Sequence, residues 1–332
     1  MGPATLEGIA MNSLLLLALL PFAEPEPEAV AATGPTVVLV VGAAGTAEYG
    51  REFKSWADNW STAAKRGGAD VIRIGSEKEQ DLPDRVHLQA ALQAAEQNTH
   101  RELWLVLIGH GTFDGKTARF NLRGPDVSAR DLATWLKPFK RPVAIVNCAA
   151  ASGPFIDRLS RDDRVVVTAT KSGTEQNFAR FGKFLSKSIG DPAADLDKDG
   201  QTSLLEAWLT ASRSTDEFYT TQGRLATEHS LLDDNGDQRG VRANAFQGTR
   251  PIAQPSGTAI VDGFRAHQFH LVPSAEERRL SLSDRVTRNE LELEIRQLRR
   301  LKPKLPAGEY AEQLETLLVR LAELYERTAA DQ

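Results

Sequence analysis

The stretch LWLVLIGHG, residues 103–111, decides the fold, because it is a buried strand that ends in a histidine between two glycines. An unbroken apolar run of this length is typical of a strand covered on both faces, as in a parallel sheet. Glycines let backbone or ligand approach closely, and His110 follows the carboxyl end of the strand. Open α/β sheets place their ligand clefts at that edge, so His110 is a candidate functional residue.

Strands and helices alternate along the chain around this stretch. Similar apolar runs predict strands at 36–42, 70–75, 142–147 and 164–170. Helical periodicity predicts helices at 48–68, 84–97, 128–136 and 177–189, with a short one from Pro154. Ser128 and Asp131 have the spacing of a capping box. The order predicts the α/β class: a mostly parallel sheet flanked by helices.

The composition is that of an ordinary globular protein. The chain has 332 residues, of which 41% are hydrophobic, and a net charge of -5 at pH 7. A mildly acidic chain lacks the basic stripe that phosphate neutralisation requires, so no nucleic-acid partner is expected. Cys148 is the only cysteine, which excludes an internal disulfide and makes the reactivity of its thiol the relevant question.

Cys148 and His110 are predicted to meet at one edge of the sheet. Each follows the carboxyl end of a buried strand, and parallel neighbours present those ends together. An ordinary thiol with a pKa of ~8.5 needs a nearby base to become a nucleophile. The backbone N–H groups of Gly111 and Cys148 are the candidate oxyanion donors. A structural histidine and a buried, inert cysteine are the alternatives for the two residues taken separately.

The segments TVVLVVGAAG, LIGHGT, AIVNCAAASG and VVVTATKSGTEQNFARFG resemble the caspase, legumain and gingipain superfamily of cysteine peptidases. The similarity covers about residues 36–190 and is greatest to the legumain branch and its bacterial relatives. The resemblance implies a caspase-like sheet, with His110 as general acid/base and Cys148 as the nucleophile that forms an acyl-enzyme. It also places Glu175 near the acidic specificity residue of the legumain pocket, as a candidate substrate-binding residue.

The surroundings of Cys148 differ from the legumain pattern. Asn147 precedes it, and AAASG follows at 149–153, where legumain-type sites have Glu-Ser-Gly after the cysteine. This difference keeps a second hypothesis open: a caspase-like fold without turnover.

The segment DLDKDGQTSLLE, residues 195–206, has the ligand spacing of an EF-hand calcium loop. The expected side-chain ligands are Asp195, Asp197, Asp199 and Glu206, at positions one, three, five and twelve. Gly200 permits the sharp turn at position six, the Gln201 carbonyl would be the position-seven ligand, and Ser203 or its water would serve at position nine. Crowded carboxylates repel one another without a cation, so the sequence predicts a structural Ca²⁺. A solvated acidic loop is the alternative.

A second acidic segment, LLDDNGDQRG at 231–240, begins with similar spacing. Asp233, Asn235 and Asp237 match the first three ligand positions, but glycine at six and a carboxylate at twelve are missing. A surface turn is the preferred interpretation, with metal or substrate contact as the alternative. His229 just upstream is a rival histidine, although no apolar strand leads into it.

The amino-terminal residues 1–31 are interpreted as a leader. The apolar stretch 14–22 is too short to span a bilayer but suits a signal-peptide core, and Ala29 and Ala31 fit an A-x-A cleavage site. No Lys or Arg precedes the core, and a disordered apolar leader is the alternative. The prediction is an exported protein without an integral membrane segment in its mature chain.

The carboxyl-terminal part changes in character. The main domain is predicted over residues 32–244, an extended connection over 245–273 and a helical hairpin over 274–332, whose leucines have helical spacing. The hairpin's apolar faces either cover the main domain or pair with another copy. The whole sequence predicts an exported cysteine endopeptidase acting on peptides or proteins. The alternative is a catalytically inactive, calcium-binding interaction module of the cell envelope.

Overall fold

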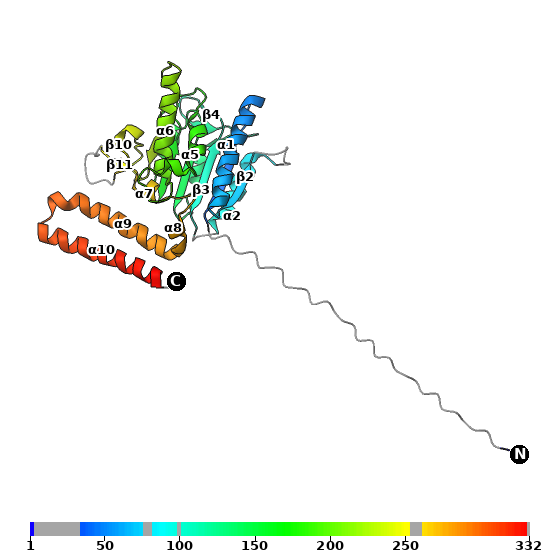
Figure 1. The fold of residues 1–332 in the computed structure, drawn as a ribbon. Coiled ribbons are helices and arrows are strands. Elements are labelled where there is room, and N and C mark those ends of the chain that lie inside the picture. The colour runs from blue at the N-terminus through cyan, green and yellow to red at the C-terminus, as the bar shows by residue number, and fades with distance from the viewer. Residues whose placement is uncertain (3–33, 76–81, 98–100, 253–260, 331–332) are drawn as a thin grey trace. The chain divides into compact units, whose positions relative to one another are not determined.

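The computed structural model describes residues 1–2, 34–75, 82–97, 101–252 and 261–330. From Gly34 onward it contains a central six-stranded sheet in the order β2-β1-β3-β7-β8-β9 (Figure 1). Its strands are β1 Thr36–Val41, β2 Asp70–Ile74, β3 Leu103–Ile108, β7 Val143–Asn147, β8 Arg164–Thr168 and β9 Leu231–Asp233. The first five pair in parallel, and β9 is antiparallel to β8. The predicted α/β class with a mostly parallel sheet is confirmed.

Helices cover both faces of the sheet because successive strand residues point to opposite sides. Val37 and Leu39 belong to one core, and Val38 and Val40 to the other. The first core includes residues of α1 (Ala47–Arg66), α5 (Phe181–Ser188) and α6 (Leu204–Thr221). The second core includes residues of α2 (Asp84–Glu96), α3 (Ala129–Trp135) and α4 (Ile156–Leu159). The sequence predicts α1, α2 and α3 to within two residues at each end, because each has an apolar stripe.

Local capping fixes where several helices start. Ser128 and Asp131 form the predicted capping box of α3, and Ser203 and Glu206 form an equivalent one at α6. The helix predicted from residue 177 begins instead at Phe181. The reason is a distant carboxylate, because Glu228 accepts hydrogen bonds from the backbone N–H groups of Arg180 and Phe181.

The remaining elements are short or carboxyl-terminal. A second small sheet, not predicted, contains β4 Gly111–Phe113, β5 Ala118–Phe120 and β6 Val127–Ser128. A two-stranded sheet contains β10 Phe246–Gln247 and β11 Arg250–Pro251. Short 3-10 turns occur at Gly153–Phe155, Pro192–Ala194, Ala243–Ala245 and Lys302–Lys304.

The predicted helical hairpin is present at the carboxyl terminus. Helices α7 (Phe264–Gln268) and α8 (Ala275–Arg279) lead into α9 (Leu282–Leu301) and α10 (Ala307–Ala330). Figure 1 shows α9 and α10 side by side, and an ion pair joins Asp284, near the start of α9, to Arg327, near the end of α10, so the two helices are antiparallel. Residues 3–31 of the predicted leader lie outside the described residues. Within the described ranges, no helix combines the length and apolar character needed to cross a membrane.

Candidate functional site

The sheet brings His110 and Cys148 together at the carboxyl ends of its strands, on the same face of the sheet. Strands β3 and β7 are neighbours, with Leu107 opposite Asn147, so the two residues follow the carboxyl ends of adjacent parallel strands. Cys148 belongs to the core on the α1 side of the sheet. The His110 ring contacts the rings of Tyr49 and Phe53, which α1 carries on that side. The two motifs, 38 positions apart in sequence, therefore meet in space.

Aromatic rings surround the half-buried His110 imidazole. Its centroid lies 4.8 Å from that of Tyr49, 5.0 Å from Phe53 and 5.8 Å from Phe178. Its Nε2 is 3.2 Å from the carbonyl oxygen of Ala44. Within the described residues, no hydrogen bond links this imidazole to the Cys148 thiol.

Cys148 is sealed in the core. The residue is 0% exposed, and it packs under α5 at Gly182, where an added Cβ would lie 2.7 Å from the Cys148 Cβ. Burial, together with the negative charge of Glu228, raises the pKa of the Cys148 thiol to about 12. The thiol is therefore neutral at physiological pH. Cys148 is thus closed to solvent in this conformation, and the catalytic roles of both residues stay a prediction.

The two predicted oxyanion donors are placed differently. The backbone N–H of Cys148 donates to the Leu107 carbonyl at 2.9 Å, as part of the sheet ladder, so its predicted availability to an oxyanion is wrong here. Gly111 is pressed against the segment after Cys148: an added Cβ would lie 2.2 Å from the Ala150 carbonyl oxygen. Glycine at 111 thus permits this close approach, while its role as an oxyanion donor stays a prediction.

The segment 171–181 passes beside the pair and contributes Phe178. Its ring lies 4.5 Å from Tyr49 and 6.0 Å from Trp56, centroid to centroid, in addition to its contact with His110. Trp56 also packs against Gly182, beside the Cys148 Cβ. Phe178 therefore joins the aromatic side chains around His110 to those around Cys148.

Glu175 holds this segment in place. Its side chain is 12% exposed, and its Oε1 lies 2.5 Å from Nδ1 of His229. It also accepts a hydrogen bond from the backbone N–H of Lys171. The structure thus brings together two residues that the sequence singled out separately. The carboxylate is occupied internally in this conformation, and its role toward substrate stays a prediction.

Glu228 is the residue near the site that sequence reasoning missed. It is buried and accepts hydrogen bonds from the N–H groups of Arg180 and Phe181 and from the Tyr219 hydroxyl. Burial raises the pKa of this carboxyl. No local pattern marks it, because its partners lie elsewhere in the chain and are defined only by the tertiary structure.

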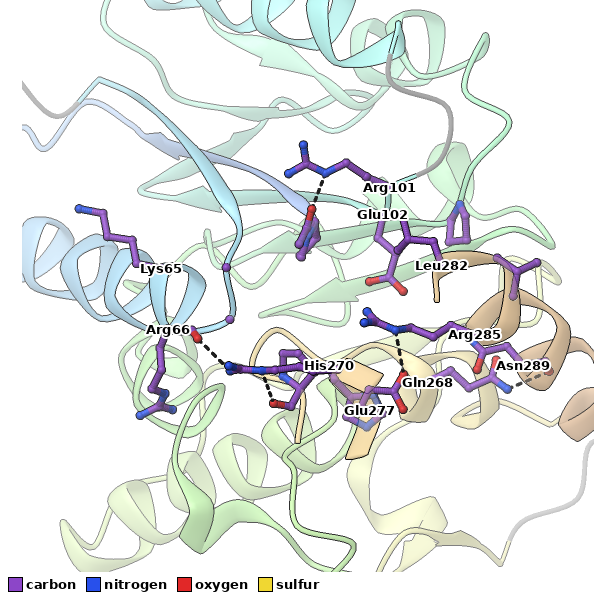
Figure 2. Close-up of a pocket in the computed structure, with 18 residues that line it drawn as sticks. Lys65, Arg66, Arg101, Glu102, Gln268, His270, Glu277, Leu282, Arg285 and Asn289 are labelled. Carbon is purple, nitrogen blue, oxygen red and sulfur yellow. Dashed lines mark hydrogen bonds and ion pairs between the residues drawn. The ribbon is translucent and has the colours of Figure 1, made fainter. Parts of the chain in front are cut away.

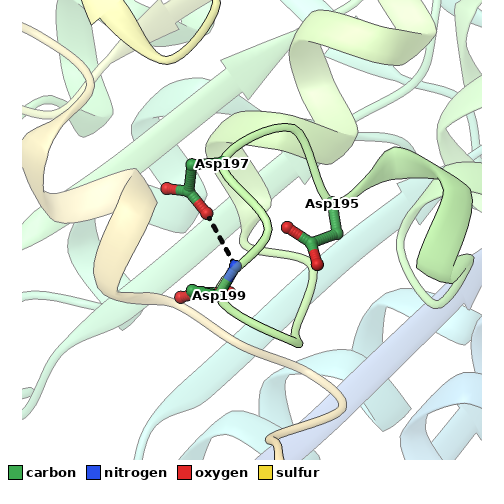
Figure 3. A group of neighbouring side chains, drawn as sticks. All are labelled: Asp195, Asp197 and Asp199. Atoms are coloured by element: carbon green, nitrogen blue, oxygen red, sulfur yellow. Dashed lines mark hydrogen bonds between the residues drawn. The ribbon is translucent and has the colours of Figure 1, made fainter.

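The acidic loop at 195–206 has a preformed turn. Oxygens of Asp195, Asp197 and Asp199 lie within 4.8 Å of one another (Figure 3). Asp195 accepts hydrogen bonds from the N–H groups of Lys198 and Gly200, and both of these residues have positive φ. Burial and the neighbouring carboxylates raise the pKa of Asp199. Three oxygens at this spacing fit a hard cation.

The other expected ligands have different contacts. Glu206 lies outside that group of three, and its oxygens accept hydrogen bonds from Leu196, Asp197 and Ser203. Asp197 Oδ2 lies 2.7 Å from His267 Nε2. Bidentate binding by Glu206 would therefore require its side chain to turn from its capping role. The Gln201 side chain accepts a hydrogen bond from the N–H of Ser274, which ties the loop to the start of α8.

The second acidic segment is only partly a surface turn. Asp233 and Asp234 are buried, contrary to expectation, because β9 joins the central sheet and Asp234 accepts hydrogen bonds from Gly263 and Ala266 at the start of α7. The turn is confined to the residues that follow, where Gly236 has a φ of +80°.

No protein-family model matches this chain. No curated protein matches it in sequence. Solved structures with some similarity include the Drosophila initiator caspase Dronc, with a TM-score of 0.42, 16% identity, and coverage of 64% of this chain and 85% of that one. Caspase-1 from Spodoptera frugiperda has a TM-score of 0.38 and 11% identity, over 65% and 93% of the two chains. Protein GSU0716 from Geobacter sulfurreducens has a TM-score of 0.38 and 10% identity, over 54% and 89%. With TM-scores below 0.5, these similarities assign no residue a role.

Proposed function

We propose that this protein is a caspase-like cysteine peptidase and that the described conformation is its closed form. The observation that carries the proposal is the meeting of His110 and Cys148 at the carboxyl edge of adjacent parallel strands, on one face of the sheet. This edge is where open α/β sheets place their sites. The substrate class is a peptide or protein.

The chemistry assigns one role to each residue. His110 takes the proton of Cys148, and the thiolate attacks the peptide carbonyl to give a tetrahedral intermediate. His110 then gives the proton to the leaving amine, which leaves an acyl-enzyme that water hydrolyses. Each step needs the sulfur within reach of the imidazole and of the substrate.

Activity therefore requires that Cys148 be uncovered. Burial disfavours the thiolate, and the Glu228 carboxylate opposes it further. Displacement of Phe178 and the adjoining residues of segment 171–181 would let water and substrate reach the edge, and hydration would lower the thiol pKa toward its ordinary value. Two anchors resist that displacement: the contact between Glu175 and His229, and the hydrogen bonds that Glu228 accepts.

A peptidyl acyloxymethyl ketone tests this proposal. The reagent should label wild-type protein stoichiometrically at Cys148, and His110→Ala should abolish labelling while the protein stays folded by circular dichroism. Cys148→Ala is the matched control for labelling at other sites. Labelling that persists in His110→Ala, or folded protein that never labels, would refute the dyad.

A second candidate function rests on the sealed state of Cys148: a catalytically inactive interaction module. A fully buried thiol with a raised pKa behaves as a small apolar side chain, as structural cysteines do. Under this alternative the protein stays unlabelled in every folded condition, and substitution of Cys148 changes stability alone.

We also propose that Asp195, Asp197 and Asp199 bind a structural Ca²⁺, with the Gln201 carbonyl and a reoriented Glu206 as further ligands. The three clustered carboxylates on a preformed turn support this proposal. Calcium at 100-fold excess over its Kd should raise the Tm by about 3–6 °C, and Asp199→Ala should remove that increase. The exposed Asp216→Ala is a matched control, and equal shifts in both variants would contradict the site. Export through the leader remains part of the proposal, and amino-terminal sequencing of secreted protein would test it.

A further inference from the structure

A cavity of about 290 Å³ lies at the opposite edge of the sheet from His110 and Cys148. Residues that precede β1, β3 and β7 line it, among them Pro35, Glu102 and Pro142. The end of α1 and the region from Gln268 to Asn289 complete the walls (Figure 2). The cavity is thus separate from the proposed catalytic edge and is built from five separate parts of the chain.

Positive charge predominates around this cavity. Its cationic lining residues are Lys65, Arg66, Arg101, Arg278 and Arg285. Its acidic lining residues are Glu102 and Glu277. Both oxygens of Glu277 already accept hydrogen bonds from the guanidinium of Arg288, so its charge is compensated within the protein. Glu102 is therefore the one lining carboxylate, among the described residues, that opposes an anion.

Two nitrogens of the lining are buried without a hydrogen-bond partner among the described residues: Nη2 of Arg101 and Nε2 of His270. The other nitrogens of Arg101 are used, because Nε donates to the Gly34 carbonyl and Nη1 pairs with Asp70. A buried donor without an acceptor costs free energy, so the polar groups of this wall are not fully satisfied within the protein.

Figure 2 shows the Glu102 carboxylate and the Arg285 guanidinium pointing toward each other in this space, with His270 nearby. The Arg285 Nε donates to the Leu280 carbonyl and lies 3.8 Å from Glu277. The outer nitrogens of a guanidinium provide the planar, two-pronged donor set that suits carboxylate and phosphate oxygens. Burial raises the pKa of Glu102 to about 7, so part of the population carries a proton that can itself be donated.

We infer that the cavity at the amino ends of the strands (the amino-edge cavity) binds a small oxyanion, carried by a phosphate or a carboxylate group, with Arg285 as its principal partner. The size supports this ligand class, because 290 Å³ is at the lower limit of pockets for small molecules and too small for a folded segment. The inference is independent of peptidase activity.

Isothermal titration of the full chain with inorganic phosphate and, separately, with succinate tests the inference at low ionic strength. Arg285→Gln should weaken binding by about tenfold or more, as expected for loss of a charge-assisted pair. Glu102→Gln should strengthen binding by several-fold, because it removes the opposing charge and keeps the shape. The exposed Arg51→Gln, on the outer surface of α1, should stay within about twofold of wild type.

The two substitutions at the cavity must act in opposite directions, which a general loss of folding would not produce. A heat of binding with phosphate but not with succinate would identify a phosphate-bearing ligand. A heat of binding with succinate but not with phosphate would identify a carboxylate. Absence of binding by both probes in wild type would overturn the inference. So would equal affinity in wild type and Arg285→Gln, because the anion would then sit elsewhere.

Discussion

The two ends of the parallel strands differ in solvent access and in charge. We call them the carboxyl edge and the amino edge of the sheet. At the carboxyl edge, Cys148 is buried under Gly182 and Trp56, and aromatic rings surround His110. At the amino edge, Glu102 and Arg285 face an accessible cavity. The edge with the recognisable motifs is thus closed, and the edge without them is open and charged. The difference teaches that a motif locates reactive groups along the chain, whereas accessibility depends on what packs over them.

The largest expected effect tests whether the carboxyl edge is closed. Iodoacetamide should alkylate Cys148 in native protein at pH 8 at least about 10³-fold more slowly than in protein unfolded by guanidinium chloride. The raised pKa alone accounts for a factor of this order, because the folded thiol carries so little thiolate at that pH. Mass spectrometry of timed samples gives both rates. Rates within tenfold of each other would show an edge open to solvent.

Opening the edge should have the next largest effect. Phe178→Ala removes the ring that contacts both His110 and Trp56, so labelling of Cys148 by the peptidyl acyloxymethyl ketone should accelerate by about 10- to 100-fold. Phe184→Ala, on the α5 side that faces Phe218, is the matched control. Equal acceleration in both variants would indicate general loosening instead of a local cover.

The sequence predicts the parts of these edges that depend on local patterns. Apolar runs identify the five parallel strands and so place His110 and Cys148 together. The sequence does not predict β9. This strand has only three residues, beside a run of acidic and turn-forming residues, and three residues are too few to show a periodicity. The cover over Cys148 is also beyond such reasoning, since it requires Gly182 and Glu228 to approach from other elements.

The amino-edge cavity could not be predicted for the same reason. Glu102 and Arg285 are 183 positions apart, and each is an ordinary charged residue beside an apolar run or within an amphipathic helix. Charges of this kind are normally solvated, and burial is decided by tertiary packing.

A pH-dependent stability difference should distinguish the charged edge from an ordinary surface. The pKa of Glu102 is about 7 in the folded protein, which is above its value in the unfolded chain. The stability that comes from the protonated carboxyl is therefore fully present below about pH 4.3 and is lost as the pH rises through 7. Glu102→Gln mimics the protonated acid. Relative to wild type, its free energy of unfolding should therefore increase by about 1–2 kcal/mol between pH 5 and pH 8, after allowance for partial exposure.

Urea denaturation at the two pH values measures this difference. The exposed Glu312→Gln on α10 is the matched control and should show no such change. If the free energy of unfolding of Glu102→Gln differs from that of wild type by the same amount at both pH values, the carboxylate is well solvated. The amino edge would then resemble an ordinary charged surface.

The smallest expected effect concerns calcium, which should act on the amino edge alone. The proposed calcium loop is tied to the wall of the cavity, because His267 contacts Asp197, Ser203 forms a β-bridge with His270, and Ser274 donates to Gln201. Calcium should therefore slow hydrogen exchange of residues 264–274 by about fivefold, a coupling on the order of 1 kcal/mol. Segment 171–181 makes no such contact among the described residues and should exchange at the same rate with and without the ion. Asp199→Ala should remove the slowing, while equal slowing in both segments would mean that calcium acts only through the global unfolding that the Tm reports, with no additional local effect at the amino edge.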